Sequence, residues 1–471
     1  MKHFKKLLLI AVIVVACELF TFIFLWNHPI KRVSGETVLS SRKPTDVTQV
    51  KVTNAAGAFT ISSKDGGYIL DDVPSELIDI DKFVAFMTNC AEVKSEKKVS
   101  DKDAVSEKFG LKNPAASAEI KFSDNTQLKL NIGNMEPVSK DYYASVEGQN
   151  AVYILKSNAV SQFLESKDSL ITHLVTPKGA AGPLSVLRNV TFSGGPLTEP
   201  VTIEATATDN QDIKRQALSF GAATHIVRGY CTYELDQTYG VTLLGSLLGI
   251  EAQKIEGYNL SSEKISSYGF DHPWMTVNFD LKTSDGITSN TLKIVRITDD
   301  SYDAMLNDSG IVYRIGKQAF MDIQYSKLQL RWFLMPLIAD LKSVKIEAQG
   351  ETYEFNIDNA DKKNPIITSG TDKIDVELFR SLFRLMTSAA NDGNYLGPQK
   401  NDSDSMLKIT YTYADESKTP DVLELKKSSE TRRADVFING KSEYRMKDTF
   451  TDRVIEGCKN VMAGIAVEEN W

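Results

Sequence analysis

The chain has 471 residues and a formal net charge of −8, with 42% apolar and 25% charged residues. These proportions are ordinary for globular material, and at ~100–200 residues per domain they predict about three domains. The acidic balance lacks the basic face that nucleic-acid-binding proteins present, which argues against a nucleic-acid partner.

The first predicted element is a membrane-spanning helix over residues 7–26. Three lysines precede this apolar run of 20 residues, in which Glu18 is the only charged side chain. A helix of that length matches the ~30 Å hydrocarbon core of a bilayer. Trp26 and Pro29 follow where an interfacial anchor and a helix stop are typical. We therefore expect a signal anchor, with residues 1–6 cytoplasmic and the rest of the chain outside the cytoplasm.

Two other interpretations of this segment stay open. Residues 14–17 fit the loose pattern of a bacterial lipoprotein cleavage site, which would make Cys17 a lipidated first residue. The residues after Cys17 remain apolar, however, and a mature lipoprotein would have no evident place to bury them. A cleaved signal peptide is disfavoured because its apolar region is usually only ~7–15 residues long. Glu18 either contacts a partner helix or is tolerated in its protonated form.

Residues 27–46 form a short tether, and beyond it one pattern occurs three times. Each copy opens with apolar residues at positions 1, 4 and 6, in the segments VTQVKV, LRNVTF and LKSVKI. These openings begin at residues 47, 187 and 341, so each copy has the size of a domain. We expect three tandem units, over residues 47–175, 184–334 and 338–467.

The first unit begins with an antiparallel meander that extends to residue 70, and a helix follows at residues 82–93. A helix-stopping FGLKNP step comes next, at residues 109–114. The rest of the unit is predicted as four strands and a short helix, at residues 118–122, 128–133, 142–146, 152–155 and 157–164.

The later units repeat this order. The second is predicted to contain a helix at residues 240–255, a YGFDHP step at 268–273, and strands at 275–281, 291–297 and 311–315. The third contains a helix at residues 376–389, a degenerate LGP step at 396–398, and strands at 406–413, 422–425, 434–438 and 444–446. The fold class is therefore α+β, with three tandem repeats of a mostly antiparallel sheet packed with one or two helices.

The FGLKNP step also carries a family resemblance. Together with the membrane anchor, the IKFSDNTQLKLNIGN hairpin, DYYASV and the AVYIL strand, it resembles the bacterial domain-of-unknown-function family numbered 4340. The resemblance covers residues 47–173 and continues, more weakly and in register, through the later two units. It implies a membrane-tethered extracytoplasmic protein of the kind often encoded beside ABC-2-type exporters and gliding-motility-like auxiliary subunits. It implies no catalytic residues.

No catalytic, cofactor or metal site is predicted. The sequence contains no GxSxG elbow, HExxH helix or phosphate-binding glycine fingerprint. Residues 298–301 and 401–405 are dense in side-chain oxygens but lack the glycine and distal glutamate of an EF-hand, so we interpret them as solvated loops. His173, His225 and His272 lie far apart in the sequence.

Three further patterns indicate packing. Cys90, Cys231 and Cys458 lie one in each unit and are expected to be buried free thiols. The apolar residues 328–338 are expected to be buried at the junction of the second and third units. Tyrosines recur in the last meander of each unit, where cross-strand packing is favoured over exposed glycan or peptide binding. They are Tyr142, Tyr143, Tyr153, Tyr302, Tyr313 and Tyr444.

The sequence thus predicts a bacterial membrane protein with one transmembrane helix and three extracytoplasmic units. We expect it to be a non-enzymatic binding or scaffold component of an ABC-type export complex, with a transporter permease or auxiliary subunit as its partner. The alternatives are an extracytoplasmic enzyme acting on cell-envelope polymer and a passive envelope or adhesive protein.

Overall fold

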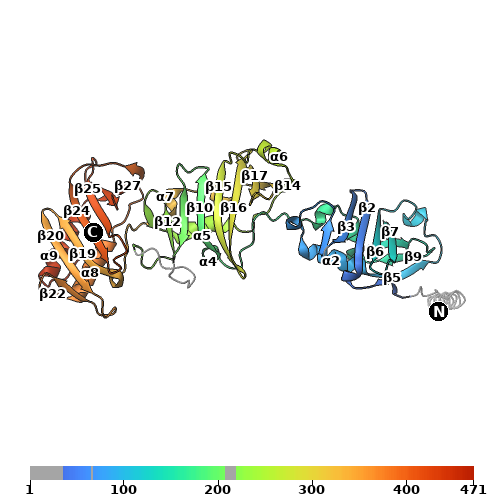
Figure 1. Ribbon diagram of the computed structural model, residues 1–471, viewed down its shortest axis with the longest axis horizontal. Helices are drawn as coiled ribbons and strands as arrows, with labels where there is room; N and C mark the ends of the chain where they lie inside the picture. The colour runs from blue at the N-terminus through green and yellow to red at the C-terminus, as the bar shows by residue number, and fades with distance from the viewer. Residues whose placement is uncertain (1–34, 65–66, 207–218) are drawn as a thin grey trace, which may run out of the picture. The chain divides into compact units, whose positions relative to one another are not determined.

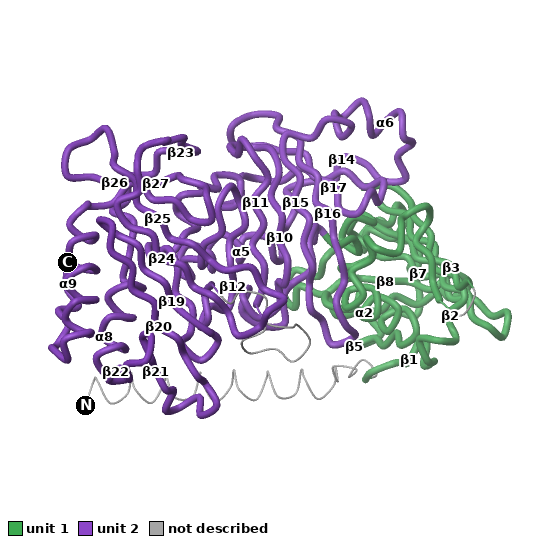
Figure 2. Tube along the Cα trace, turned by 60° about the vertical axis from the view of Figure 1, so that its left-hand side comes forward, with its two compact units in different colours: residues 1–172 green, residues 173–471 purple. Residues whose placement is uncertain are grey.

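The computed structural model describes residues 35–64, 67–206 and 219–471. The chain divides into two compact units, residues 1–172 and residues 173–471 (Figure 2). The predicted membrane-spanning segment at residues 7–26, with Cys17 inside it, lies outside the described residues. Within the described part of the chain, no helix is both long and apolar enough to cross a membrane.

The described residues form three sheets of nine strands, and every strand pairs with its neighbours in the antiparallel direction (Figure 1). Three antiparallel sheets accompanied by a few helices confirm the α+β class and the repeated sheet. In spatial order the first sheet contains β1 (Thr37–Ser41), β5 (Glu92–Ser100), β9 (Val152–Leu155), β8 (Tyr142–Val146), β7 (Gln127–Met135), β6 (Ala116–Phe122), β2 (Val47–Asn54), β3 (Gly57–Lys64) and β4 (Gly67–Leu70).

The other two sheets lie in the unit of residues 173–471. The second contains β14 (Lys254–Gly257), β18 (Val312–Gly316), β17 (Ser301–Leu306), β16 (Gly286–Arg296), β15 (Met275–Thr283), β10 (Leu187–Gly194), β11 (Val201–Ala205), β12 (His225–Arg228) and β13 (Thr232–Glu234). The third contains β23 (Tyr395–Gln399), β27 (Lys441–Lys447), β26 (Arg433–Ile438), β25 (Asp421–Lys427), β24 (Ser405–Tyr413), β19 (Leu341–Ala348), β20 (Glu351–Asp358), β21 (Ile366–Ser369) and β22 (Asp372–Ile374).

The three sheets share one strand order. In each of them the opening strand (β2, β10 or β19) is central, and the last strand (β9, β18 or β27) pairs with the strand that follows the helix (β5, β14 or β23). The first sheet differs only at its margins, where β1 is added beyond β5 and no strand corresponds to β13 and β22. The apolar pattern that the sequence repeats three times therefore corresponds to a sheet topology that is also repeated three times.

A β-bulge explains why the openings are spaced 1, 4 and 6. In a regular strand positions 1 and 4 face opposite sides, yet here positions 1, 4 and 6 of all three openings are buried. The pairing of β2 with β6 shifts by one residue between Val47 and Gln49. The pairings β10–β15 and β19–β24 shift just after Leu187 and Leu341. The extra residue returns position 1 to the buried face, so the spacing encodes the bulge.

Each repeat places one longer helix between its two groups of strands. These helices are α2 (Ile80–Ala91), α5 (Gln237–Gly245) and α8 (Val376–Thr387). Each begins after an aspartate whose carboxylate accepts hydrogen bonds from backbone N–H groups of the first turn: Asp79, Asp236 and Asp375. Against the sheets, ring centroids lie 6.1 Å apart for Phe59 of β3 and Phe86 of α2, and 5.3 Å apart for Phe355 of β20 and Phe379 of α8.

The other helices are shorter or were not predicted. The predicted helix at residues 240–255 is wrong in its second half, because α5 ends at Gly245 and residues 254–257 form β14. Ser246 bonds the carbonyl of Leu243 at this end, and Gly249 takes a φ of +66°, so the apolar residues that follow pack as irregular chain. The remaining α-helices are α3 (Ser157–Val160), α4 (Pro183–Val186), α6 (Ser262–Ser267), α7 (Tyr325–Leu328) and α9 (Thr449–Met462).

The second and third sheets share a core. One cluster of buried side chains runs from β12 and β13 into the third sheet, and Phe333 and Leu334 of the connecting segment belong to it. The prediction that residues 328–338 are buried at this junction is confirmed for Leu328, Phe333 and Leu334, whereas Trp332 and Leu337 are exposed. The connection therefore joins these two sheets instead of acting as a linker.

The glycine of each repeated step adopts a left-handed conformation. Gly110, Gly269 and Gly397 have φ values of +71°, +92° and +71°. At Gly110 a Cβ atom would lie 2.4 Å from the Oδ1 of Asn134, because the step packs closely against β7. At Gly397 a Cβ atom would meet nothing within 4 Å. The two glycines thus share one backbone conformation and differ in the space around them.

We predict that Gly110→Ala destabilises its sheet more than Gly397→Ala does. Left-handed backbone alone costs about 1–2 kcal/mol for alanine, and overpacking adds about 1–3 kcal/mol at the first position only. Native-state hydrogen exchange of the full chain, read by mass spectrometry on β7 and β27, measures both losses. Equal losses at the two positions would contradict the packing argument.

Candidate functional site

A pocket of about 350 Å³ lies between the second and third sheets, inside the unit of residues 173–471. Its walls come from the β10–β11 turn, the β12–β13 turn, the start of α7, and the strands β23 and β27. Six of the fifteen lining residues are tyrosines or prolines: Tyr230, Tyr325, Tyr395, Pro196, Pro200 and Pro398. A concave site of this size with aromatic walls is typical of small-ligand binding.

The side chain of Glu443 lies at the base of this pocket and is only 1% exposed. The hydroxyls of Tyr325 and Tyr233 lie 3.1 Å and 3.2 Å from its Oε2, and the hydroxyl of Tyr395 lies 3.3 Å from its Oε1. Tyr325 also accepts a hydrogen bond from the backbone N–H of Cys231. Three phenols from three elements therefore converge on one buried carboxyl group.

A second β-bulge places Glu443 in the pocket. The pairing of β26 with β27 shifts between Val436 and Phe437, and Glu443 is the unpaired extra residue. The equivalent pairings β8–β9 and β17–β18 run without a shift. Immediately before the closing tyrosine, the first two repeats carry the buried valines Val152 and Val312, but in the pairing the counterpart of Val152 is Ser442, so Glu443 is an added residue of the third repeat. The third repeat thus departs from the common plan at the residue that lines the pocket.

Burial dominates the electrostatics of this group. Desolvation raises the pKa of the Glu443 carboxyl above its ordinary value, and the hydrogen bonds from Cys231 and the three tyrosines only partly oppose that shift. Burial likewise raises the pKa of Cys231 and of Tyr395 to about 12 each. No lysine, arginine or histidine is among the described residues that line the pocket. The carboxyl therefore has hydrogen-bond donors around it but no cation of its own.

The positions singled out from the sequence are explained by packing. Cys90, Cys231 and Cys458 are buried free cysteines, as predicted. Of the six tyrosines predicted to pack across strands, Tyr142 and Tyr143 are half-buried. The other four are buried, which confirms the packing interpretation: Tyr153, Tyr302, Tyr313 and Tyr444. The sequence did not identify the three tyrosines that contact Glu443, because they come from distant parts of the chain. They are Tyr233, Tyr325 and Tyr395.

The oxygen-rich loops and the histidines do not converge. Asn401 donates hydrogen bonds to the carbonyl of Lys427 and to Asp435, which ties its loop to β25 and β26. His225 is buried in β12, whereas His173 and His272 are exposed on other segments. Within the described ranges, no group of three or more His, Cys, Asp or Glu side chains is arranged to hold a metal ion.

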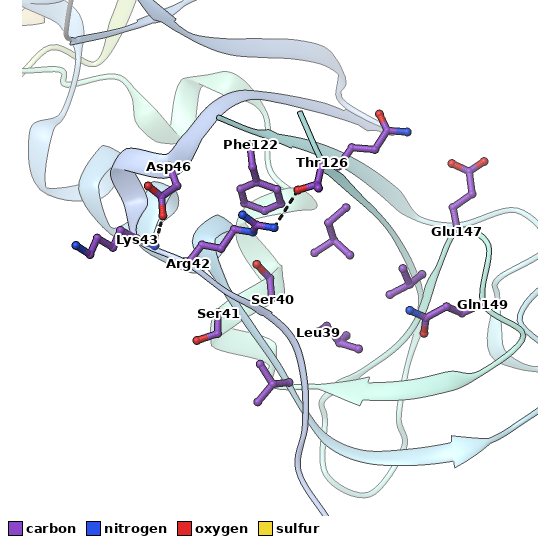
Figure 3. A pocket seen from close by; sticks show the side chains of 14 residues that line it. Leu39, Ser40, Ser41, Arg42, Lys43, Asp46, Phe122, Thr126, Glu147 and Gln149 are labelled. Atoms are coloured by element: carbon purple, nitrogen blue, oxygen red, sulfur yellow. Dashed lines mark hydrogen bonds between the residues drawn. The ribbon is translucent and has the colours of Figure 1, made fainter. Parts of the chain in front are cut away.

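A larger pocket of about 960 Å³ lies in the first unit, between β1 with the segment after it and the ends of β6, β7 and β8 (Figure 3). Arg42 reaches across it, bonding Asp124 at 2.7 Å and Thr126 at 2.9 Å, and lies 4.5 Å from the ring centroid of Phe122. Hydrogen bonds from Thr126, and then from Arg42, lower the pKa of Asp124 to about 2. Because the guanidinium of Arg42 is already paired with the β6–β7 turn, it has less capacity to bind a ligand. The Glu443 pocket is therefore the stronger candidate site.

Residues 79–177 match the family model described as Domain of unknown function (DUF4340). This match confirms the recognition made from the first repeat, and it runs from the start of α2 past β9. No curated protein gives a significant match to the chain. No solved structure does so either.

We predict that Glu443 makes the stability of the protein fall as pH rises through its folded-state pKa. Because that pKa is raised, the folded protein holds a proton that the unfolded chain releases, so the stabilisation is complete at low pH and lost above the raised value. Calorimetric unfolding of the full chain from pH 5 to pH 8 should show this slope. Glu443→Gln should remove the part of the slope that Glu443 contributes, leaving that of Glu234 and His225, whose pKa values burial also shifts, and Glu424→Gln, on β25 away from the pocket, should leave the slope unchanged. An identical slope in Glu443→Gln would refute the assignment.

Proposed function

We propose that this protein is a non-enzymatic binding or scaffold component of an ABC-type export complex. In this proposal residues 7–26 anchor it in the bacterial cell membrane, and the three sheets lie outside the cytoplasm. The apolar run of residues 7–26 and the family resemblance of the first repeat support the anchor and the transporter partner.

The observation that carries the proposal is the construction of one sheet three times, with a ligand-sized pocket at a bulge that the other two copies lack. Repeated units stacked in one chain provide extended binding surface, which is how many scaffold proteins work. The added Glu443 introduces a buried acidic group, and the cost of burying such a group is typical of functional sites.

The polar face of the second sheet supports a docking role. Its side chains hold one another in rows across neighbouring strands: Asn189 donates to Asp280 at 2.9 Å, and Thr291 donates to Asn278 at 2.8 Å. Thr191 shares a hydrogen bond of 2.8 Å with Thr202. Side chains that are already ordered lose little conformational entropy when a partner binds.

We predict that the full-length protein, solubilised from native membranes in a mild detergent, co-purifies with an ABC-transporter permease. Quantitative mass spectrometry against a matched strain without the tagged protein measures the enrichment. Protease added to intact spheroplasts should degrade residues 35–471 and should fail to do so if they lie in the cytoplasm. Extracellular accessibility without permease enrichment would favour the passive envelope protein.

An enzyme acting on cell-envelope polymer is the second candidate, because two carboxyl groups line the pocket. Glu199 lies on the exposed β10–β11 turn and Glu443 at the base. A pair of carboxyl groups, one with a raised pKa, is the arrangement that glycoside hydrolases use.

We predict that the purified full-length protein releases no soluble fragments from isolated cell-envelope polymer. Chromatography of the supernatant with mass detection makes the measurement, with a known hydrolase as positive control. Release that is lost in both Glu199→Gln and Glu443→Gln, and retained in Glu424→Gln, would overturn the non-enzymatic proposal.

A further inference from the structure

We infer that the pocket of Glu443 binds an organic ammonium ion. This inference names a ligand class for the proposed binding role and rests on that role. It follows from three properties of the pocket: the sign of its charges, the nature of its walls, and the residue that the other two repeats carry immediately before the closing tyrosine.

The charged side chains that line the pocket are both acidic. Glu443 is at the base and Glu199 at the rim, and no basic side chain is found among the described lining residues. On β27, Lys441 donates from its Nζ to the carbonyl of Tyr230 at 2.9 Å, and Arg445 pairs with Asp435 at 2.6 Å. A carboxylate buried without a cation is costly, so a cation supplied by a ligand would be held strongly there.

The aromatic walls suit an alkylated cation. The rings of Tyr325 and Tyr395 meet edge to face, with centroids 5.8 Å apart, and Tyr230 lies on the opposite turn. Such tyrosine faces attract ammonium groups through the ring quadrupole, and the attraction is stronger where the cation is desolvated. Lys441 already places its ammonium 5.2 Å from the Tyr230 ring centroid. Pro196, Pro200 and Pro398 would contact the methyl or methylene groups of the ligand.

The comparison between repeats separates this role from a structural one. An added residue that served packing alone would be apolar, like the buried valines that precede the closing tyrosines at residues 152 and 312, because valine leaves no polar group to satisfy. The third repeat instead carries a carboxyl group, an added bulge and three phenol donors at this place. These donors hold the carboxylate in one orientation.

Choline and its neutral isostere 3,3-dimethyl-1-butanol test the inference directly, since they differ in charge and hardly in shape. Full-length protein in a choline-free maltoside detergent is titrated with each by isothermal calorimetry at pH 8. We expect choline to bind at least tenfold more tightly than the alcohol. Nα-acetyl-lysine amide forms a second arm: binding of this probe in place of choline would assign the ammonium to a lysine side chain of a protein partner.

Matched variants locate the site. Glu443→Gln should weaken ammonium binding at least tenfold, whereas Glu424→Gln should leave it unchanged. Tyr395→Leu should weaken binding, and Tyr395→Phe, which keeps the ring, should weaken it less. Glu443→Val introduces the residue that precedes the closing tyrosine in the first two repeats and should abolish binding while hydrogen exchange in β23 and β27 stays native, which separates loss of the site from loss of the fold.

Binding should also weaken as pH falls, because protonation removes the charge of Glu443. The groups that face this carboxyl are Cys231, Tyr233, Tyr325 and Tyr395, whose pKa values are all raised by burial, so they stay neutral at pH 8 and below. Glu443, whose pKa burial raises, is therefore the group whose protonation we expect to weaken binding as pH falls.

Equal affinity for choline and the neutral alcohol would overturn the inference. So would the failure of both ammonium probes to bind a protein with native hydrogen exchange. These measurements use purified protein, so they do not depend on membrane orientation or on a transporter. Ammonium binding without permease enrichment would support the ligand assignment and contradict the export role. Permease enrichment without ammonium binding would support the export role and contradict the ligand assignment.

Discussion

One inserted residue in the central strand decides which side chains each sheet buries. Without the bulge after Val47, Leu187 and Leu341, the first apolar residue of every opening would face away from the helix, and the core would lose a large side chain at its centre. The same residue sets the register with the neighbouring strand, from which the rest of the meander is built. A local irregularity thus fixes the arrangement of nine strands, three times over.

The Glu443 pocket uses the same device for another purpose. Where the first kind of bulge turns an apolar side chain inward, the bulge between β26 and β27 turns an acidic one toward a cavity. The surrounding tyrosines reach it because the second and third sheets share a core, which brings Tyr233 of one within 3.2 Å of Glu443 of the other. A site of this kind needs two repeats, and a single sheet could not form it.

The sequence predicted the parts of this fold that have a local cause. The openings, the helices α2 and α8, and the left-handed glycines were visible because periodicity and turn chemistry act over a few residues. The end of α5 could not be predicted, because Leu247 and Ile250 continue the apolar pattern of the helix although they pack in the core as irregular chain. Helix α9 was missed although Phe450, Val454, Cys458 and Val461 follow helical spacing, and the pocket was missed because its residues are about 200 positions apart. Aligning VY, VY and EY across the three repeats would have pointed to Glu443.

The shared core of the second and third sheets couples the pocket to the integrity of the whole second unit. Phe333 and Leu334 contribute to one continuous apolar cluster, so melting of either sheet would expose the other and the two should unfold in a single cooperative transition. The cavity between them therefore persists as long as that unit is folded. Substitutions in the connecting segment, residues 328–338, would therefore change the distance between the two walls of the cavity, although they lie away from its tyrosines.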